Sequence, residues 1–241
     1  LRYLQEVHFD IIDIGGESTR PFSDPVTEAE EIRRVVPVIE QLAERVGVPI
    51  SIDTTKSEVA RQALAAGASI INDISALRVD PAMAPLAASQ DVPVILMHML
   101  GTPKTMQMKP AYRDVVAEVH AFLVDAIERA VGQGIDRTRI IVDPGIGFGK
   151  TVEHNLILLR RLAAFHDLNV PLLVGASRKA FIRNLLKPEG AQDIPADRPI
   201  VETGSQAAAV AAVLNGAHIV RVHNVANTRA ALTVIDAIRN A

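Results

Sequence analysis

The sequence has no cysteine and no tryptophan, and aromatic residues make up only 3% of its 241 positions. The absence of cysteine excludes disulfide bonds and thiolate chemistry and fits a reducing compartment, so we expect a cytoplasmic protein. Hydrophobic residues nevertheless amount to 49% of the chain. Because few of them are aromatic, the interior must be aliphatic, which is typical of parallel strands buried on both faces.

A strong net charge of either sign is also missing. The 25 Lys and Arg residues are balanced by 28 Asp and Glu residues, which leaves a formal net charge of −3. This balance gives no electrostatic basis for binding a nucleic acid or an anionic membrane. We find no signal-peptide pattern and no apolar run long enough to cross a bilayer, and we expect a soluble protein without a membrane partner.

Strand-like and helix-like segments alternate along the whole chain. Short apolar runs bounded by Gly or Pro predict strands buried on both faces. Longer amphipathic stretches separate them. One spans residues 27–47, starts at a Thr with acidic residues in its first turn, and is expected to stop at Gly47. The predicted strands lie within residues 9–15, 48–54, 68–74, 92–98, 139–145, 170–177 and 218–224.

Alternation of this kind implies a parallel sheet, and no linker divides residues 1–241, so we predict a single α/β domain. A closed (β/α)8 TIM barrel has eight strands. The seven found here predict such a barrel with its first strand upstream of Leu1. An open doubly wound sheet is the alternative, but no glycine fingerprint follows an early strand, as a dinucleotide-binding unit requires.

The glycine-rich stretch DPGIGFGKT at residues 143–151 is close to a phosphate-binding P-loop. A P-loop needs Gly-x-x-x-x-Gly-Lys-[Ser/Thr], because unhindered backbone N–H groups must wrap the phosphates. Counting back from Gly149 and Lys150, the first glycine position holds Pro144. Proline lacks both the N–H group and the conformational freedom that the turn requires. We therefore expect no nucleotide site in this stretch.

Polar residues collect where the predicted strands end, which is where the active sites of such barrels lie. Taken singly, most have a structural explanation: Asp53 would cap the next helix, and Asp143 would form a turn with Pro144. Together, these two carboxylates and the amide of Asn72 suit a flat heterocycle with ring N–H groups and an exocyclic amine. The strand-end residues are Asp13, Asp53, Asn72, Asp73, His98, Asp143, Ser177, Arg178, Lys179, Arg221 and His223.

Two of the strand ends indicate an anion site. Arg221 and His223 lie two positions apart on a strand and therefore point to the same side. A cation beside a histidine suits an anionic ligand there, with a structural ion pair as the alternative. Ser177 is expected to cap the following helix, which would put Arg178 and Lys179 in a first turn, where the helix dipole disfavours positive charge. We therefore expect these cations to serve a ligand.

Seven segments are similar, in order and spacing, to those of the dihydropteroate synthases, a family of the folate pathway. The resemblance implies a (β/α)8 barrel, usually a homodimer, that condenses 6-hydroxymethyl-7,8-dihydropterin diphosphate with p-aminobenzoate and releases diphosphate. It also implies Mg²⁺ as a cofactor and sulfonamides as competitors of p-aminobenzoate. The segments are DIGGESTRP (13–21), SIDT (51–54), INDI (71–74), LMHMLGTPKTMQ (96–107), DPGIGFGK (143–150), GASRK (175–179) and HIVRVHNV (218–225).

The resemblance implies a role for each matching residue. The groups expected to take part in catalysis are Lys179, Asp143, Arg221 and His223. The pterin pocket would contain Asp53, Asn72, Asp143 and Lys179, with Met97 and Gly175 in its walls. The diphosphate would be held by Arg221 and His223. The p-aminobenzoate site would contain Thr19, Arg20, Pro21, Phe148 and Lys179.

The implied reaction needs no side-chain nucleophile. Departure of diphosphate leaves a cation that the pterin ring delocalises, so the protein has to stabilise the separating charges and exclude water. Arg221, His223 and Mg²⁺ would take the negative charge on the leaving group, while Asp53 and Asp143 would favour the cationic ring. The arylamine then attacks the methylene carbon.

The sequence departs from the family pattern at three points. The family's first strand, with an asparagine expected to contact Mg²⁺ and diphosphate, is not in this sequence, so we expect no metal ligand in this chain. Ala180 stands where many relatives have a serine, and Phe22 where a glycine is common.

Two alternative functions follow from these departures. One is a methyltetrahydrofolate–corrinoid methyltransferase, although Arg221 and His223 argue against a donor without diphosphate. The other is a pterin-binding barrel with impaired turnover.

Overall fold

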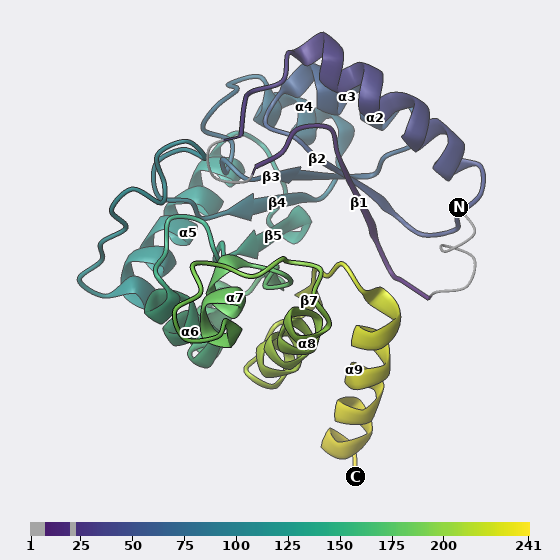
Figure 1. Cartoon of the computed structure of the whole chain (residues 1–241). Helices are drawn as coiled ribbons and strands as arrows, with labels where there is room; N and C mark the ends of the chain where they lie inside the picture. The colour runs from purple at the N-terminus through teal and green to yellow at the C-terminus, as the bar shows by residue number, and fades with distance from the viewer. Residues whose placement is uncertain (1–7, 20–22) are drawn as a thin grey trace.

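Strands and helices alternate through the chain, as the sequence pattern predicts (Figure 1). The computed structural model describes residues 8–19 and 23–241. All seven predicted strands are present in these ranges. They are β1 (Ile12–Gly15), β2 (Ile50–Asp53), β3 (Ile70–Asp73), β4 (Val94–Met97), β5 (Ile140–Asp143), β6 (Leu173–Val174) and β7 (Ile219–Val220).

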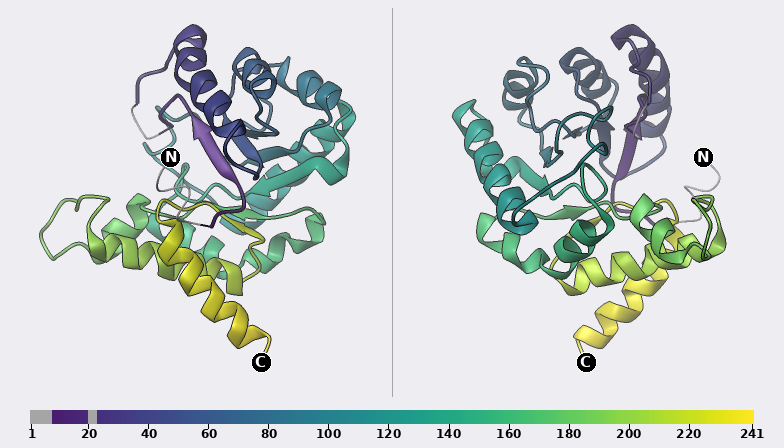
Figure 2. Two further views of the ribbon diagram at one scale, coloured as in Figure 1. Left: turned by 90° about the vertical axis from the view of Figure 1, so that its right-hand side faces the viewer. Right: turned by 60° about the vertical axis from the view of Figure 1, so that its left-hand side comes forward.

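The helices lie between the strands and after the last one (Figures 1 and 2). The α-helices are α2 (Glu28–Ala43), α3 (Ser57–Ala65), α4 (Met83–Gln90), α5 (Val115–Gly132), α6 (Val152–Arg160), α7 (Ala180–Leu186), α8 (Pro199–Leu214) and α9 (Val225–Arg239). Two 3-10 helices are η1 (Arg137–Arg139) and η2 (Leu162–Leu168). Within the described ranges, no helix has the length and apolar character needed to cross a membrane.

The first long helix, α2, shows how local sequence sets its ends. It begins as predicted, because the Thr27 hydroxyl accepts a hydrogen bond from the backbone N–H of Glu30 at 3.3 Å. The predicted end at Gly47 is wrong, since the α-helix ends at Ala43. The chain tightens there, with the N–H groups of Arg45 and Val46 both donating to the Leu42 carbonyl.

The strands form two parallel sheets that are linked edge to edge. Strands β1 to β5 pair in sequence order, and β6 pairs with β7. A bridge between Val142 and Leu172 connects β5 to the start of the second sheet. This sequential order excludes the doubly wound alternative, in which the strand order reverses at a switch point. In residues 8–19 and 23–241 no ladder joins β7 to β1, but Arg221, directly after β7, contacts Asp13 of β1 across the interior.

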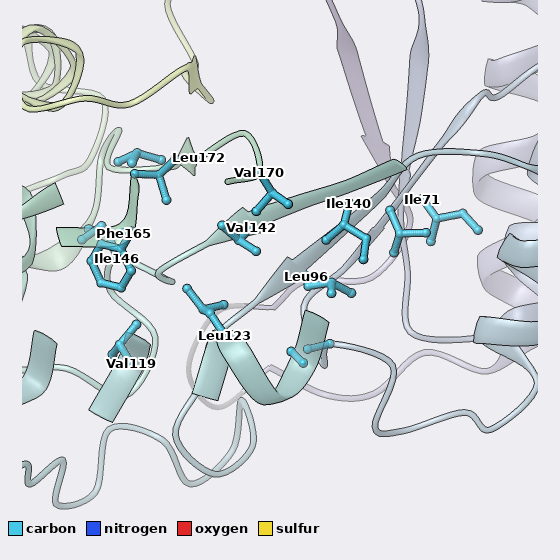
Figure 3. Close-up of a cluster of buried hydrophobic side chains, with 14 of the residues drawn as sticks. Ile71, Leu96, Val119, Leu123, Ile140, Val142, Ile146, Phe165, Val170 and Leu172 are labelled. Atoms are coloured by element: carbon cyan, nitrogen blue, oxygen red, sulfur yellow. The ribbon is translucent and has the colours of Figure 1, made fainter. Parts of the chain in front are cut away.

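The outward-facing strand residues build the main core against the helices. Ile71, Leu96 and Val142, on three neighbouring strands, are fully buried in one cluster with Val119 and Leu123 of α5 (Figure 3). These side chains are aliphatic, as the composition predicts. The helices thereby fix the outer face of the sheet, and the alternate strand positions are left to face inward.

The inward-facing residues form two layers of different polarity. Near the amino ends of the strands, Ile70, Ile95 and Leu173 pack into a small apolar cluster. Because side chains alternate along a strand, the next inward positions are two residues further on, toward the carboxyl ends. Most of these positions carry polar or small residues, such as Asn72 and Gly175, and Met97 is the exception. An apolar layer therefore lines the half of the interior near the amino ends of the strands, and a mainly polar chamber occupies the other half.

Candidate active site

A polar network joins the carboxyl ends of β1, β2 and β3 to the segment after β7. Arg221 Nε lies 2.8 Å from Asp13 Oδ2, and Arg221 Nη2 lies 3.4 Å from Asp53 Oδ2. The Asn72 amide donates to both carboxylate oxygens of Asp13, at 3.3 and 3.4 Å. The structure thus brings together Asp53, Asn72 and Arg221, which lie far apart in the sequence.

Neither Asp53 nor Asn72 has a local structural role at its strand end. Asp53 caps no helix, because α3 begins after Lys56 and has no side-chain cap bond. Beside Asn72 it is Asp73 that makes the turn, accepting a hydrogen bond from the Ser75 backbone N–H at 2.7 Å. Asp53 and Asn72 are therefore left to face the interior.

Asp53 has an unusual acidity for a carboxyl group. Burial and, to a smaller extent, the negative charge of Asp13 raise its pKa to about 7, against the opposing effects of the charges of Arg221 and Lys179. The side chain therefore changes charge close to neutral pH. A carboxyl group in this state can either accept from a ligand N–H group or donate a proton of its own.

Asp143, at the end of β5, makes the turn that its sequence suggested, and it lies within the influence of the Lys179 and Arg221 charges although it lines neither of the two cavities described below. Its Oδ1 accepts a hydrogen bond from the Gly145 N–H at 2.7 Å. Burial raises the pKa of Asp143, against the opposing effects of that hydrogen bond and of the charges of Lys179 and Arg221. The residue is 8% exposed and lies in register with Met97 of β4.

Lys179 and Phe148 form a cation–π pair. The Lys179 ammonium lies 3.9 Å from the centroid of the Phe148 ring, which is within the range of this interaction. A glycine is needed next to Phe148, because a Cβ on Gly147 would lie 2.9 Å from Lys179 Cδ. Met97 and Met106 pack with Phe148 in one apolar cluster. The ammonium thus lies over one face of the Phe148 ring.

The segment after β6 differs from the prediction. Ser177 caps no helix: its hydroxyl lies 3.0 Å from His223 Nδ1, and α7 begins three residues later. Arg178 adopts a left-handed backbone with φ of 57°, its N–H donates to Ser205 Oγ, and its guanidinium lies 3.1 Å from Glu202. The predicted placement of Arg178 and Lys179 in a first helical turn is therefore wrong.

Arg221 and His223 both line the cavity described below, but the prediction that they lie on a strand is wrong, because β7 ends at Val220. The two residues differ in charge. Burial lowers the pKa of His223, and the charges of Arg178 and Arg221 lower it further. The imidazole is therefore neutral at neutral pH and offers hydrogen bonds. Arg221 supplies the permanent positive charge, and its contacts with Asp13 and Asp53 mean that the structural ion pair considered above is also present.

A cavity of about 2090 Å³ opens beside the network. Asp53 and Thr19 line an adjoining pocket of about 380 Å³. Met97 is buried, at 3% exposed. The predicted Arg20 and Pro21 lie outside the described residues, as does Phe22. The predicted residues that line the larger cavity are Thr19, Asn72, Phe148, Gly175, Lys179, Arg221 and His223.

Lys150 has a role in the site that the sequence does not indicate. Its ammonium lies 2.9 Å from His98 Nδ1 and from the Gly145 carbonyl, and 3.1 Å from the Phe148 carbonyl. Burial lowers its pKa to about 7. The lysine of the DPGIGFGKT stretch therefore holds its own loop against the loop after β4. No local sequence pattern indicates these contacts of Lys150. The inward position of Asp13, by contrast, follows from the alternation of side chains along β1.

Comparison with known proteins assigns the family. A family model described as "Pterin binding enzyme" matches residues 8–223. Dihydropteroate synthase of Escherichia coli K12 is 48% identical over 231 residues, which cover 96% of this chain and 79% of that protein. The enzyme of Bacillus subtilis is 42% identical over 230 residues, which cover 95% of this chain and 75% of that protein.

Solved structures agree with these relatives. A Yersinia pestis dihydropteroate synthase with a sulfonamide drug complex superposes with a TM-score of 0.93 at 43% identity, covering 100% of this chain and 84% of that chain. The Xanthomonas albilineans enzyme in complex with 7,8-dihydropteroate gives 0.86 at 43% identity, covering 100% and 83%. These neighbours are TIM barrels, so the predicted fold class and family resemblance are confirmed. The chain belongs to the dihydropteroate synthases, a family of pterin-binding transferases in folate biosynthesis.

Proposed function

We propose that this chain condenses 6-hydroxymethyl-7,8-dihydropterin diphosphate with p-aminobenzoate to give 7,8-dihydropteroate and diphosphate. Relatives named dihydropteroate synthase, and solved neighbours bound to 4-aminobenzoic acid or to 7,8-dihydropteroate, support the proposal. The observation that carries it is the polar network around Arg221 next to the Lys179–Phe148 pair. This arrangement offers acceptors for a pterin, a cation for its leaving group and an aromatic surface for the arylamine.

The pterin would bind in the polar chamber. Asp143 and Asp53 would accept hydrogen bonds from its ring N–H groups and exocyclic amine, and the Asn72 amide would both donate and accept. Met97 and Gly175 would contribute to the walls. Lys179, whose charge acts on both carboxyl groups, would keep them ionised when the ligand is bound.

The bond that breaks joins the pterin methylene carbon to the diphosphate oxygen, and its electron pair leaves with diphosphate. Arg221 and His223 would stabilise the negative charge that develops on that oxygen. Asp53 and Asp143 would stabilise the cation delocalised over the ring, and their burial strengthens this electrostatic effect. The p-aminobenzoate amine then forms the new C–N bond and loses one proton.

The p-aminobenzoate site would lie at the Lys179–Phe148 pair. The Phe148 ring offers a face for the aryl ring, and the Lys179 ammonium offers a counter-charge for the carboxylate. Thr19 would border the site, together with Arg20 and Pro21 outside the described residues. Sulfonamides, which also carry an aryl amine, would compete there.

Mg²⁺ would enter with the substrate. In the ranges that the structure describes, no group of three or more His, Cys, Asp or Glu side chains could hold a metal ion, so the residues present do not form a dedicated metal site. Mg²⁺ characteristically keeps several water ligands and binds through substrate phosphates with few protein carboxylates. The ion would then add positive charge at the leaving group.

We further infer a homodimer acting in the cytoplasm. Helices α8 and α9, which pack against each other, expose large apolar side chains, and such surfaces mark protein interfaces. The compartment is inferred from the cysteine-free composition. Sedimentation equilibrium would test the dimer, with a monomer mass at micromolar concentration as the contrary result. The exposed side chains are Ile200, Leu214, Val234 and Ile238.

Turnover tests the proposed function directly. The protein is incubated with pterin diphosphate and labelled p-aminobenzoate, with and without Mg²⁺, and labelled 7,8-dihydropteroate is separated by chromatography. Product formation is expected and should be stronger with Mg²⁺. Pterin binding without product would support the impaired barrel. Methyl transfer from methyltetrahydrofolate to a corrinoid, without pteroate formation, would support the methyltransferase.

A further inference from the structure

Asp13 makes the shortest contact with Arg221, yet the reaction described above gives it no role. Its carboxylate lies 2.8 Å from Arg221 Nε, whereas the contact from Asp53 is 3.4 Å. The Asp13 side chain is 17% exposed, while that of Arg221 is 46% exposed and lines the cavity. Asp13 is thus the more buried partner, and it holds a guanidinium that reaches into open space.

Asp13 also orients a second ligand-facing side chain. Both of its oxygens accept hydrogen bonds from the Asn72 amide. This leaves the amide oxygen of Asn72 directed away from Asp13. One carboxylate on β1 therefore fixes both the cation after β7 and the amide at the end of β3.

A carboxylate in this position competes with diphosphate. Guanidinium groups bind carboxylate and phosphate oxygens in the same planar geometry. A diphosphate that contacts Arg221 from the cavity must share the guanidinium with Asp13, and the Asp13 charge repels it. The contact that positions Arg221 therefore also weakens its hold on the anion.

We propose that Asp13 is a positioning residue that holds Arg221 at the cavity wall and competes with diphosphate for it, so that the product anion is released. The proposal rests on the proposed function, in which diphosphate is the leaving group. It predicts an effect of unusual sign: removal of the Asp13 charge makes the site bind pyrophosphate more tightly. Loss of a residue that only supports the fold would weaken binding or leave it unchanged.

The test compares Asp13→Asn with the parent protein and with Asp10→Asn. The first change keeps the side-chain size and removes one charge. The control removes the same charge from the same segment, at a side chain that is 92% exposed and 3.6 Å from Arg229. Inorganic pyrophosphate and 6-hydroxymethylpterin are titrated calorimetrically at pH 8.5. At this pH Asp53, with a pKa of about 7, is ionised in the parent, and loss of the Asp13 charge can only lower that pKa.

Asp13→Asn is expected to bind pyrophosphate on the order of tenfold more tightly, because one charge-assisted contact of Arg221 becomes neutral. Its affinity for the bare pterin should not rise, because the Asn72 amide loses one of the two oxygens that orient it. Asp10→Asn should change both affinities by less than about twofold, since exposed charges are screened. Unchanged or weaker pyrophosphate binding by Asp13→Asn overturns the proposal. If that variant does not fold, Asp13→Ser removes the same charge and has the same expected result. Turnover by the parent protein, measured separately, tests the proposed function independently of this affinity ratio.

Discussion

Replacing Arg221 by alanine should separate the binding of the leaving group from the binding of the ring. The guanidinium is the permanent cation at the expected diphosphate position, while His223 beside it is neutral because burial lowers its pKa. Hydrogen bonds to charged groups contribute about 1.5 to 3 kcal/mol. At 1.4 kcal/mol per factor of ten, affinity for the pterin diphosphate should fall roughly 10- to 150-fold.

The same substitution has a second effect that depends on pH. The charge of Arg221 opposes the rise in the pKa of Asp53, which burial and Asp13 bring to about 7. Without Arg221 this pKa rises further, so Asp53 becomes protonated at neutral pH and loses an acceptor for the pterin ring. The bare pterin should therefore also bind more weakly at pH 7, and this loss should shrink at pH 9, where a larger fraction of Asp53 is ionised.

Calorimetric titrations of Arg221→Ala with pterin diphosphate and with 6-hydroxymethylpterin, at pH 7 and pH 9, measure both effects. Arg139→Ala is the matched control, because it removes a positive charge whose side chain is 42% exposed, paired with Asp91 at 2.7 Å, and lines neither cavity. The control should change neither affinity by more than about twofold, since exposed ion pairs contribute little. Equal losses for the two ligands at pH 9 would show that Arg221 does not bind the diphosphate.

Three further changes test other parts of the site. Asp143→Asn should weaken binding of the bare pterin by about 1 to 3 kcal/mol, because an amide has one acceptor oxygen where a carboxylate has two; unchanged affinity in a calorimetric titration would remove Asp143 from the site. Asp53→Asn should be less destabilising at pH 8 than at pH 4 in urea unfolding. A folded pKa of about 7, raised from 3.8, means that the parent loses stability as pH rises through this range, and an equal stability difference at both pH values would contradict the raised pKa. Gly145→Ala should lower the free energy of unfolding by more than the roughly 1 to 2 kcal/mol expected of left-handed backbone alone, because the new Cβ would lie 1.8 Å from the His98 carbonyl oxygen. Gly190 also has a positive φ but no atom near its Cβ position, so Gly190→Ala should show the backbone effect only. Similar losses of unfolding free energy for the two variants would contradict the packing argument.

The sequence pattern predicts the strands well because parallel barrel strands are buried on both faces. Each apolar run bounded by Gly or Pro, such as residues 48–54 and 92–98, contains a strand of the structure. Helix ends follow less directly. Thr27 begins α2 through its own side chain, which is a local signal, but the end at Ala43 depends on how the chain turns toward β2.

The site is predictable to the extent that its residues lie at strand ends. Asp53, Asn72 and Arg221 meet because the carboxyl ends of parallel strands gather at one rim. Ser177 was misinterpreted because a serine before a helix usually caps it, and its actual partner, His223, lies 46 positions away. Contacts across such distances leave no trace in the local sequence.

The glycine-rich stretch explains why a near match to a nucleotide motif arises without a nucleotide site. Gly145 and Gly149 both have positive φ, and a Cβ on either would collide with the loop after β4, at His98 or at Leu100. These glycines are thus required by the close approach of two loops. The approach brings backbone carbonyls together, and the buried ammonium of Lys150 satisfies those of Gly145 and Phe148. Glycines followed by a lysine therefore solve a packing problem here, and the loop they fix places Phe148 at the cavity wall.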